Sequence, residues 1–167
     1  NLCREMVLCG ANVVITQHSH CIGCYEEYEG GHIVYGQGNF HFCWANMAET
    51  WYTSLLIEVE IEKELKINFI PLLTKEKGIE VAKGEEADEI MRALFERNKE
   101  LQNGKWKDGW HAFCIKMQDT YKGVLQGLCT PETKEETTEL FSHFLDCEAH
   151  TDVWRELFPT WNMTNEK

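Results

Sequence analysis

The sequence predicts an α+β protein with a β-rich front and a helical back. Short alternating or β-branched apolar stretches dominate residues 1–83, whereas apolar residues recur every three or four positions beyond Gly84. A chain of 167 residues is long enough for one domain with a helical appendage. No Pro/Gly-rich linker separates the two parts. We therefore predict a mixed α+β domain at 1–105 and a helical extension at 106–167.

A short helix and a buried strand are predicted to open the front. Leu2, Met6 and Val7 form an apolar stripe, and Gly10 suits the left-handed residue that ends many helices. The run at 13–15 is Val-Val-Ile, which is typical of a strand buried on both faces. A polar loop follows this strand.

Hairpins are predicted to build the rest of the front. Gly30-Gly31 is the expected turn of the first hairpin, because both glycines tolerate positive φ. In the second, one face should be buried and the other mostly wet, because Leu55, Ile57, Val59 and Ile61 alternate with Ser54, Leu56, Glu58 and Glu60. The predicted strands are 24–28, 33–35, 52–61, 64–73 and 78–81.

Three helices are predicted in the back, at 85–103, 106–128 and 133–157. Thr133 and Glu136 have the spacing of a capping box at the start of the third helix. Aromatic residues at helical spacing are expected to form the core between packed helices. These residues are Trp106, Trp110, Phe113, Tyr121, Phe141, Phe144, Trp154, Phe158 and Trp161.

Composition and charge exclude several classes of partner. The chain is 43% hydrophobic and 26% charged, as in a globular protein, and it has no apolar run near the roughly 20 residues of a membrane span. Its 16 basic and 28 acidic residues give a net charge of −12. This balance opposes binding to nucleic acid or to an anionic membrane surface, because both depend on Lys and Arg.

Eight cysteines are numerous for this length, but they do not form the pattern of a small disulfide scaffold. Four of them lie in apolar periodic segments and are predicted to be free, buried thiols, at Cys3, Cys9, Cys114 and Cys129. The others are Cys21, Cys24, Cys43 and Cys147. Free thiols favour a reducing compartment, so we expect the chain in the cytoplasm.

The densest group of chemically active residues is His18-Ser19-His20, directly after the strand predicted at 13–15. In extended backbone, residues two apart project to one side, about 6.6 Å apart at Cα. Two imidazoles so placed can bind one metal, or one metal and a second group that bridges to it, and ligand sites often lie beyond the carboxyl ends of strands. The alternative is a pair of surface histidines in a loop. Nearby, Gly36 and Gly38 indicate backbone held close to another group, which the spacing does not identify.

Two weaker motifs remain open. Cys21 and Cys24 have the spacing of a zinc knuckle, for which His18 and His20 would supply the other ligands, or of a redox dithiol; incidental free thiols are the plainer interpretation. Cys147 and His150 lie at i, i+3 on the third predicted helix and can chelate a metal, or can be one buried thiol and one surface imidazole. No phosphate-binding loop or dinucleotide fingerprint is present in the sequence.

Two ordered segments resemble the capsule-synthesis (CapA, poly-γ-glutamate synthesis) proteins. Residues 10–20, Gly-Ala-Asn-Val-Val-Ile-Thr-Gln-His-Ser-His, resemble the family segment GAD-V-V-I-G-H-H-P-H. Residues 33–42, Ile-Val-Tyr-Gly-Gln-Gly-Asn-Phe-His-Phe, resemble the segment I-x-Y-S-L-G-N-F-x-F at the expected distance. Residues 106–167 match no family pattern.

This family is similar in fold to the calcineurin-like metallophosphoesterases, which have a layered α/β/β/α sandwich and a two-metal site at the strand ends. The resemblance implies that His18 and His20 are catalytic metal-site residues and that Asn39 is a positioning residue beside them. It implies divalent metal ions (Mn, Fe, Zn or Ni), two in the full-length protein. It also implies a metal-dependent hydrolase acting on a phosphorylated small molecule or polymer intermediate in capsule or polyglutamate metabolism, or a metal centre that serves an amide-forming complex there.

The sequence departs from the family pattern in three loop positions, with Gln17 for glycine or histidine, Ser19 for proline and Gln37 for leucine. The family's upstream ligand segments have no counterpart, and the chain opens on Asn1. We therefore expect the C-terminal part of such a protein, inactive by itself, with membrane or surface anchoring only through an upstream segment. The competing hypothesis is a non-enzymatic assembly module with a vestigial metal site, whose C-terminal helices bind a protein partner.

Overall fold

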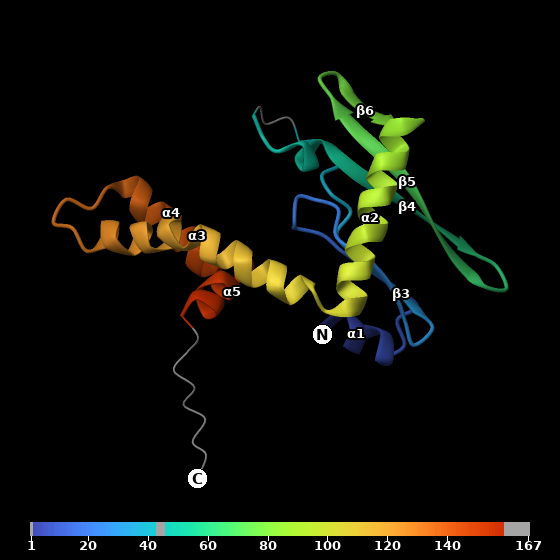
Figure 1. The fold of residues 1–167 in the computed structure, drawn as a ribbon, viewed down its shortest axis with the longest axis horizontal. Helices are drawn as coiled ribbons and strands as arrows, with labels where there is room; N and C mark the ends of the chain where they lie inside the picture. The colour runs from blue at the N-terminus through green and yellow to red at the C-terminus, as the bar shows by residue number, and fades with distance from the viewer. Residues whose placement is uncertain (1, 43–45, 159–167) are drawn as a thin grey trace, which may run out of the picture. The chain divides into compact units, whose positions relative to one another are not determined.

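A computed structural model describes residues 2–42 and 46–158. The chain folds into two compact units, 1–104 and 105–167, and has the predicted α+β class (Figure 1). Asn1, Cys43 and Trp161 lie outside the described residues. The elements of the front unit are α1 (Leu2–Leu8), β1 (Val13–Thr16), β2 (Tyr25–Tyr28), β3 (Gly31–Tyr35), η1 (Glu49–Tyr52), β4 (Thr53–Ile61), β5 (Leu65–Lys75), β6 (Gly78–Val81) and α2 (Glu85–Asn103).

The first sheet has the strand order β1-β3-β2, with β1 parallel and β2 antiparallel to β3. The turn between β2 and β3 is Glu29-Gly30, with φ values of 47° and 79°, so the predicted Gly30-Gly31 turn is wrong by one residue. Gly31 belongs to β3 instead. A Cβ at Gly31 would lie 2.6 Å from Cγ1 of Val7, so glycine is needed there because α1 packs closely on the strand.

The second sheet is antiparallel, in the order β4-β5-β6. Leu55 and Ile57 face α2 as the alternation predicts, but Ile61 is 81% exposed because no described element covers that end of β4. On the opposite face, Ser54 is 2% exposed rather than wet, because Gly38 pairs with it in a β-bridge. The predicted alternation is therefore confirmed from Leu55 to Glu60 and is wrong at Ser54 and Ile61, the two ends of the predicted stretch.

The front unit is layered, with α1 on one face of the first sheet and α2 on the other side (Figure 1). Val7 of α1 packs on Val14 and Ile33. The prediction that β1 is buried on both faces is wrong, since Ile15 is 39% exposed where no described element covers it. From the second face, Tyr25 packs edge-on against Phe69 of β5, at 5.1 Å between ring centroids.

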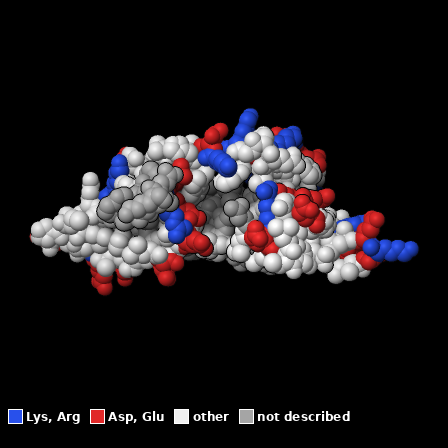
Figure 2. Space-filling view, turned by 90° about the horizontal axis from the view of Figure 1, so that it is seen from below, with Lys and Arg blue, Asp and Glu red and all other residues white. Residues whose placement is uncertain are grey.

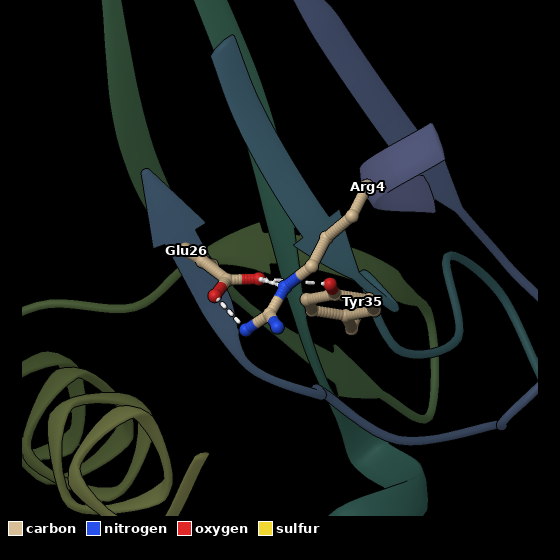
Figure 3. Close-up of polar contacts among 3 residues, drawn as sticks. All are labelled: Arg4, Glu26 and Tyr35. Carbon is tan, nitrogen blue, oxygen red and sulfur yellow. Dashed lines mark hydrogen bonds and ion pairs between the residues drawn. The ribbon is translucent and has the colours of Figure 1, made fainter. Parts of the chain in front are cut away.

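Polar contacts fasten both helices to the first sheet. The Arg4 guanidinium of α1 donates to both carboxylate oxygens of Glu26 in β2, and the Tyr35 hydroxyl donates to the same carboxylate at 2.9 Å (Figure 3). The hydrogen bonds from Arg4 lower the pKa of Glu26, and partial burial opposes this shift. On the other side, Arg97 Nε of α2 donates to the Gly23 carbonyl at 3.1 Å, and Asn98 accepts from the Tyr25 amide at 2.7 Å.

The back unit is a cluster of three helices, α3 (Trp106–Leu128), α4 (Glu135–Asp146) and α5 (Glu148–Leu157). Its core is apolar and includes the predicted Tyr121 and Phe144, with Trp110, Phe141 and Trp154 packed against it. Trp106, Phe113 and Phe158 are 43–48% exposed, contrary to prediction. The described parts of α4 and α5 are shorter than α3, so they cannot cover its whole apolar stripe.

The bounds predicted for α2 and α3 are confirmed, whereas the third predicted helix is divided at Cys147, whose ψ of 118° is extended. The predicted capping box is also wrong. The Thr133 hydroxyl donates to the carbonyls of Thr130 and Leu128, and α4 begins at Glu135 without a side-chain cap. A local loop interaction therefore replaces the expected cap.

The seven described cysteines are all free. Cys114 is fully buried as predicted, but Cys9 and Cys129 are exposed because each lies at the end of a helix rather than on its packed face. None of the helices in the described ranges is long and apolar enough to cross a membrane. On the face seen in Figure 2, basic side chains stand among acidic ones rather than in one continuous patch.

Candidate functional site

The candidate site forms where two loops leave the same edge of the first sheet. Because β1 and β3 are parallel, the loop after Thr16 and the loop after Tyr35 start side by side. A β-bridge between Ile22 and Gln37 joins them, and the amide of Gly23 donates to the Gly36 carbonyl at 3.1 Å. The structure thus brings the histidine loop and Asn39 together.

The glycines of the second loop are needed for close contact, which confirms the prediction made from their spacing. A Cβ at Gly36 would lie 2.6 Å from the Ser19 hydroxyl oxygen, and a Cβ at Gly38 would lie 2.5 Å from the Thr53 carbonyl oxygen. Both glycines also have positive φ, 110° and 81°. The amide of Leu55 donates to the Gln37 carbonyl at 2.7 Å, so this loop connects the first sheet to β4.

The imidazole of His20 is held on several sides. Its Nδ1 lies 2.8 Å from Oδ1 of Asn39. The ring stacks on Trp51 with 4.5 Å between centroids and an interplanar angle of 5°, and Phe42 meets it edge-on at 5.1 Å. These contacts restrict rotation of the half-buried ring.

The hydrogen bonds of Asn39 determine which ring nitrogen of neutral His20 carries the proton. Its side chain is buried, and its Nδ2 donates to the carbonyls of His20 and Trp51, each at 3.1 Å. Because both N–H groups are so used, Oδ1 is the atom facing His20 and must accept a hydrogen bond from Nδ1–H. Neutral His20 therefore keeps its lone pair on Nε2. This is the arrangement of most histidines that bind metals, which donate their other ring N–H to an oxygen.

His18 lies near His20 but in a different setting. Its side chain is exposed, and the two ring centroids are 6.2 Å apart. His18 has φ of 116° and His20 has φ of 55°, both unusual for a residue with a Cβ. Strained backbone of this kind costs on the order of 1–3 kcal/mol and concentrates at functional sites.

The donor set fits part of a metal site. Two imidazoles at this separation can face one divalent ion, or two ions about 3.5–4 Å apart. Among residues 2–42 and 46–158, no group of three or more His, Cys, Asp or Glu side chains could hold a metal. Within those ranges the histidine pair therefore supplies nitrogen ligands without an adjoining carboxylate.

The alternative metal motifs gain no support. The Cys24 thiol donates to the Arg97 carbonyl at 3.5 Å, and burial raises its pKa, which disfavours the thiolate that zinc or redox chemistry needs. The four-ligand knuckle is not formed among the described residues. His150 packs inside the helical unit, stacked on Phe144 at 4.3 Å, with Nδ1 2.5 Å from the Tyr121 hydroxyl.

Sequence reasoning did not identify Trp51 and Phe42 as contacts of the His20 ring. It also missed the hydrogen bonds that Gln17 makes to the second loop. Trp51 lies in η1, 31 positions after His20, and no local pattern connects them. Gln17 is noticeable in sequence only as a departure from the family pattern. Its two hydrogen bonds to the second loop depend on the fold.

The fold and this edge of the sheet define an α+β protein with a histidine pair at its strand ends. The family model described as bacterial capsule synthesis protein PGA_cap matches residues 1–43. This match confirms the capsule-synthesis resemblance for that part of the chain, which includes His18, His20 and Asn39. No curated protein and no solved structure matches the chain.

Proposed function

We propose that His18 and His20 are ligands of a divalent metal centre in a capsule-synthesis protein that hydrolyses a phosphoester. The substrate class is a phosphorylated small molecule or polymer intermediate. The match over residues 1–43 supports the family. The observation that carries the metal assignment is the hydrogen bonding of Asn39, which leaves Nε2 of His20 as the accepting nitrogen.

Each residue has a definable part in such a centre. A divalent metal, when bound, would polarise a phosphoryl oxygen and activate a water. His20 offers Nε2, Asn39 keeps the proton on Nδ1, and Trp51 shields one face of the ring from water. His18 offers a second imidazole from the adjacent strained backbone. Imidazole suits Zn, Fe and Ni, and the resemblance adds Mn.

The test is zinc content after equilibrium dialysis, measured by elemental analysis. We expect His18→Ala/His20→Ala to lose the zinc that wild type retains, and Asn39→Ala to bind it roughly 10- to 100-fold more weakly. His111→Ala is the matched control, because His111 lies in the back unit against Glu156. Equal zinc in every variant would contradict the assignment.

We expect no phosphodiester hydrolysis by the 167-residue chain alone, so turnover that His18→Ala abolishes would contradict that expectation.

A second function, docking of a protein partner, is favoured by the back unit. Trp106, Phe113 and Phe158 expose 43–48% of their surface, and large exposed aromatics are common at interfaces. A stable complex unaffected by His18→Ala/His20→Ala but lost in Trp106→Ala/Phe113→Ala would favour this assembly role.

As for location, the free cysteines fit a reducing compartment, and we place the chain in the cytoplasm.

A further inference from the structure

The side chain of Gln17 fills two backbone hydrogen-bonding positions of the glycine loop. Its Nε2 donates to the Gly38 carbonyl at 2.6 Å, and its Oε1 accepts from the Gln37 amide at 3.1 Å. Gly38 and Asn39 are buried, and Gln37 is half-buried. The bond to the Gly38 carbonyl is partly buried, where an unpaired backbone group is costly, whereas the bond from the Gln37 amide is exposed.

The neighbouring groups of the loop are satisfied by backbone. The Gly36 carbonyl accepts from Gly23, and the Gln37 carbonyl accepts from Leu55. Gln17 thus completes a set of contacts in which the loop is bonded on one side to β4 and on the other to the histidine loop. It does so from the position immediately before His18.

Only a primary amide of this length can make both bonds. Glutamate would accept from Gln37 but would place a carboxylate against the Gly38 carbonyl oxygen, and alanine would make neither bond. The capsule-synthesis segment has glycine or histidine at this position. The double contact is therefore a feature of this chain and not of the pattern it resembles.

We propose that Gln17 is a positioning residue that holds Gln37 and Gly38 so that Asn39 stays against His20. Asn39 follows Gly38 directly, and its Oδ1 must remain within hydrogen-bonding distance of Nδ1 to keep the lone pair on Nε2. Release of the loop frees the amide to move away, and the ring then samples both neutral tautomers. The use of this ordering for metal binding rests on the proposed function, whereas the ordering itself does not.

The experiment compares wild type with Gln17→Ala, Gln17→Glu and a control, Gln102→Ala, at an exposed glutamine of α2. It measures amide hydrogen exchange at Gln37, the ¹⁵N signature of the His20 tautomer, and the affinity for Zn²⁺. In Gln17→Ala we expect exchange at Gln37 to rise on the order of tenfold, the tautomer to become mixed, and zinc affinity to fall about tenfold. Gln17→Glu should retain protection at Gln37 yet still mix the tautomers.

Each outcome separates this inference from the proposed function. Unchanged exchange and an unchanged tautomer in Gln17→Ala would overturn the inference, even if wild type binds zinc. A mixed tautomer in a protein that binds no zinc would support the positioning role and contradict the metal centre. If Gln17→Ala fails to fold, the His20 tautomer in Gln17→Glu decides the question alone. A pure Nδ1–H form of His20 in that variant would count against the inference.

Discussion

In the front unit the candidate site is held by polar side chains that pair across long stretches of sequence, whereas the core of the back unit is held by apolar side chains that pack between neighbouring helices. His20 and Asn39 are 19 positions apart, and Tyr25 and Asn98 are 73 apart. In the back unit, Cys114, Phe144 and Val153 are each 5% exposed or less.

The hydrogen-bonded site and the helical core should therefore respond differently to substitution. A cluster held by burial loses stability in proportion to the volume removed. A loop held by a few directed hydrogen bonds keeps its overall stability but loses the orientation of a ring. Stability measurements should therefore report on the apolar cores, that of the back unit included, and ligand-binding and tautomer measurements on the candidate site of the front unit.

The largest effect is expected from Phe144→Ala in the back unit. Removing a buried phenyl ring costs about 3–5 kcal/mol of unfolding free energy, through lost burial and the cavity left behind. Hydrogen exchange should accelerate throughout α3, α4 and α5 and stay unchanged in β1 and β3. Leu145→Ala is the matched control, because Leu145 is 62% exposed and adjacent in sequence. Equal losses in the two variants would mean that Phe144 is not in the core.

A smaller effect of opposite sign is expected from His18→Gly. Glycine adopts a φ of 116° without strain, so the free energy of unfolding should rise by about 1 kcal/mol while zinc affinity falls. Denaturant titration measures the first quantity and equilibrium dialysis the second. Glu29→Gly relieves a φ of 47° in the β2–β3 turn and should stabilise without changing zinc affinity. Destabilisation by His18→Gly would show that the backbone there is not strained.

The smallest effect concerns the ion pair that fastens α1 to β2. Because the folded state lowers the pKa of Glu26, its contribution is present above the unfolded value of about 4.3 and is lost as pH falls through the folded pKa. The Arg4 side chain is 40% exposed, so Glu26→Gln should cost only about 0.5 kcal/mol at pH 7. Denaturant titrations at several pH values should show wild type and variant converging in acid. Glu29→Gln, in the exposed turn, is the control, and a gap that persists at low pH would contradict this origin.

Local sequence determined the positions of most elements. The bounds of α2, α3 and β6 follow from periodicity, because a long apolar stripe permits one helix register and a short alternating stretch one strand register. The two resembling segments also located His18, His20 and Asn39 at strand ends. Their proximity follows from the parallel pairing of β1 and β3, which the structure shows and the sequence did not predict.

Only the tertiary structure decided the rest. The break at Cys147, the exposure of Ile15 and Trp106, and the pairing of Ser54 with Gly38 depend on which surfaces other elements cover. The tautomer of His20 depends on carbonyls and a ring contributed from positions up to 31 residues away. Such contacts leave no periodic signal, because hydrogen bonds between distant loops are fixed by folding as a whole and not by spacing along the chain.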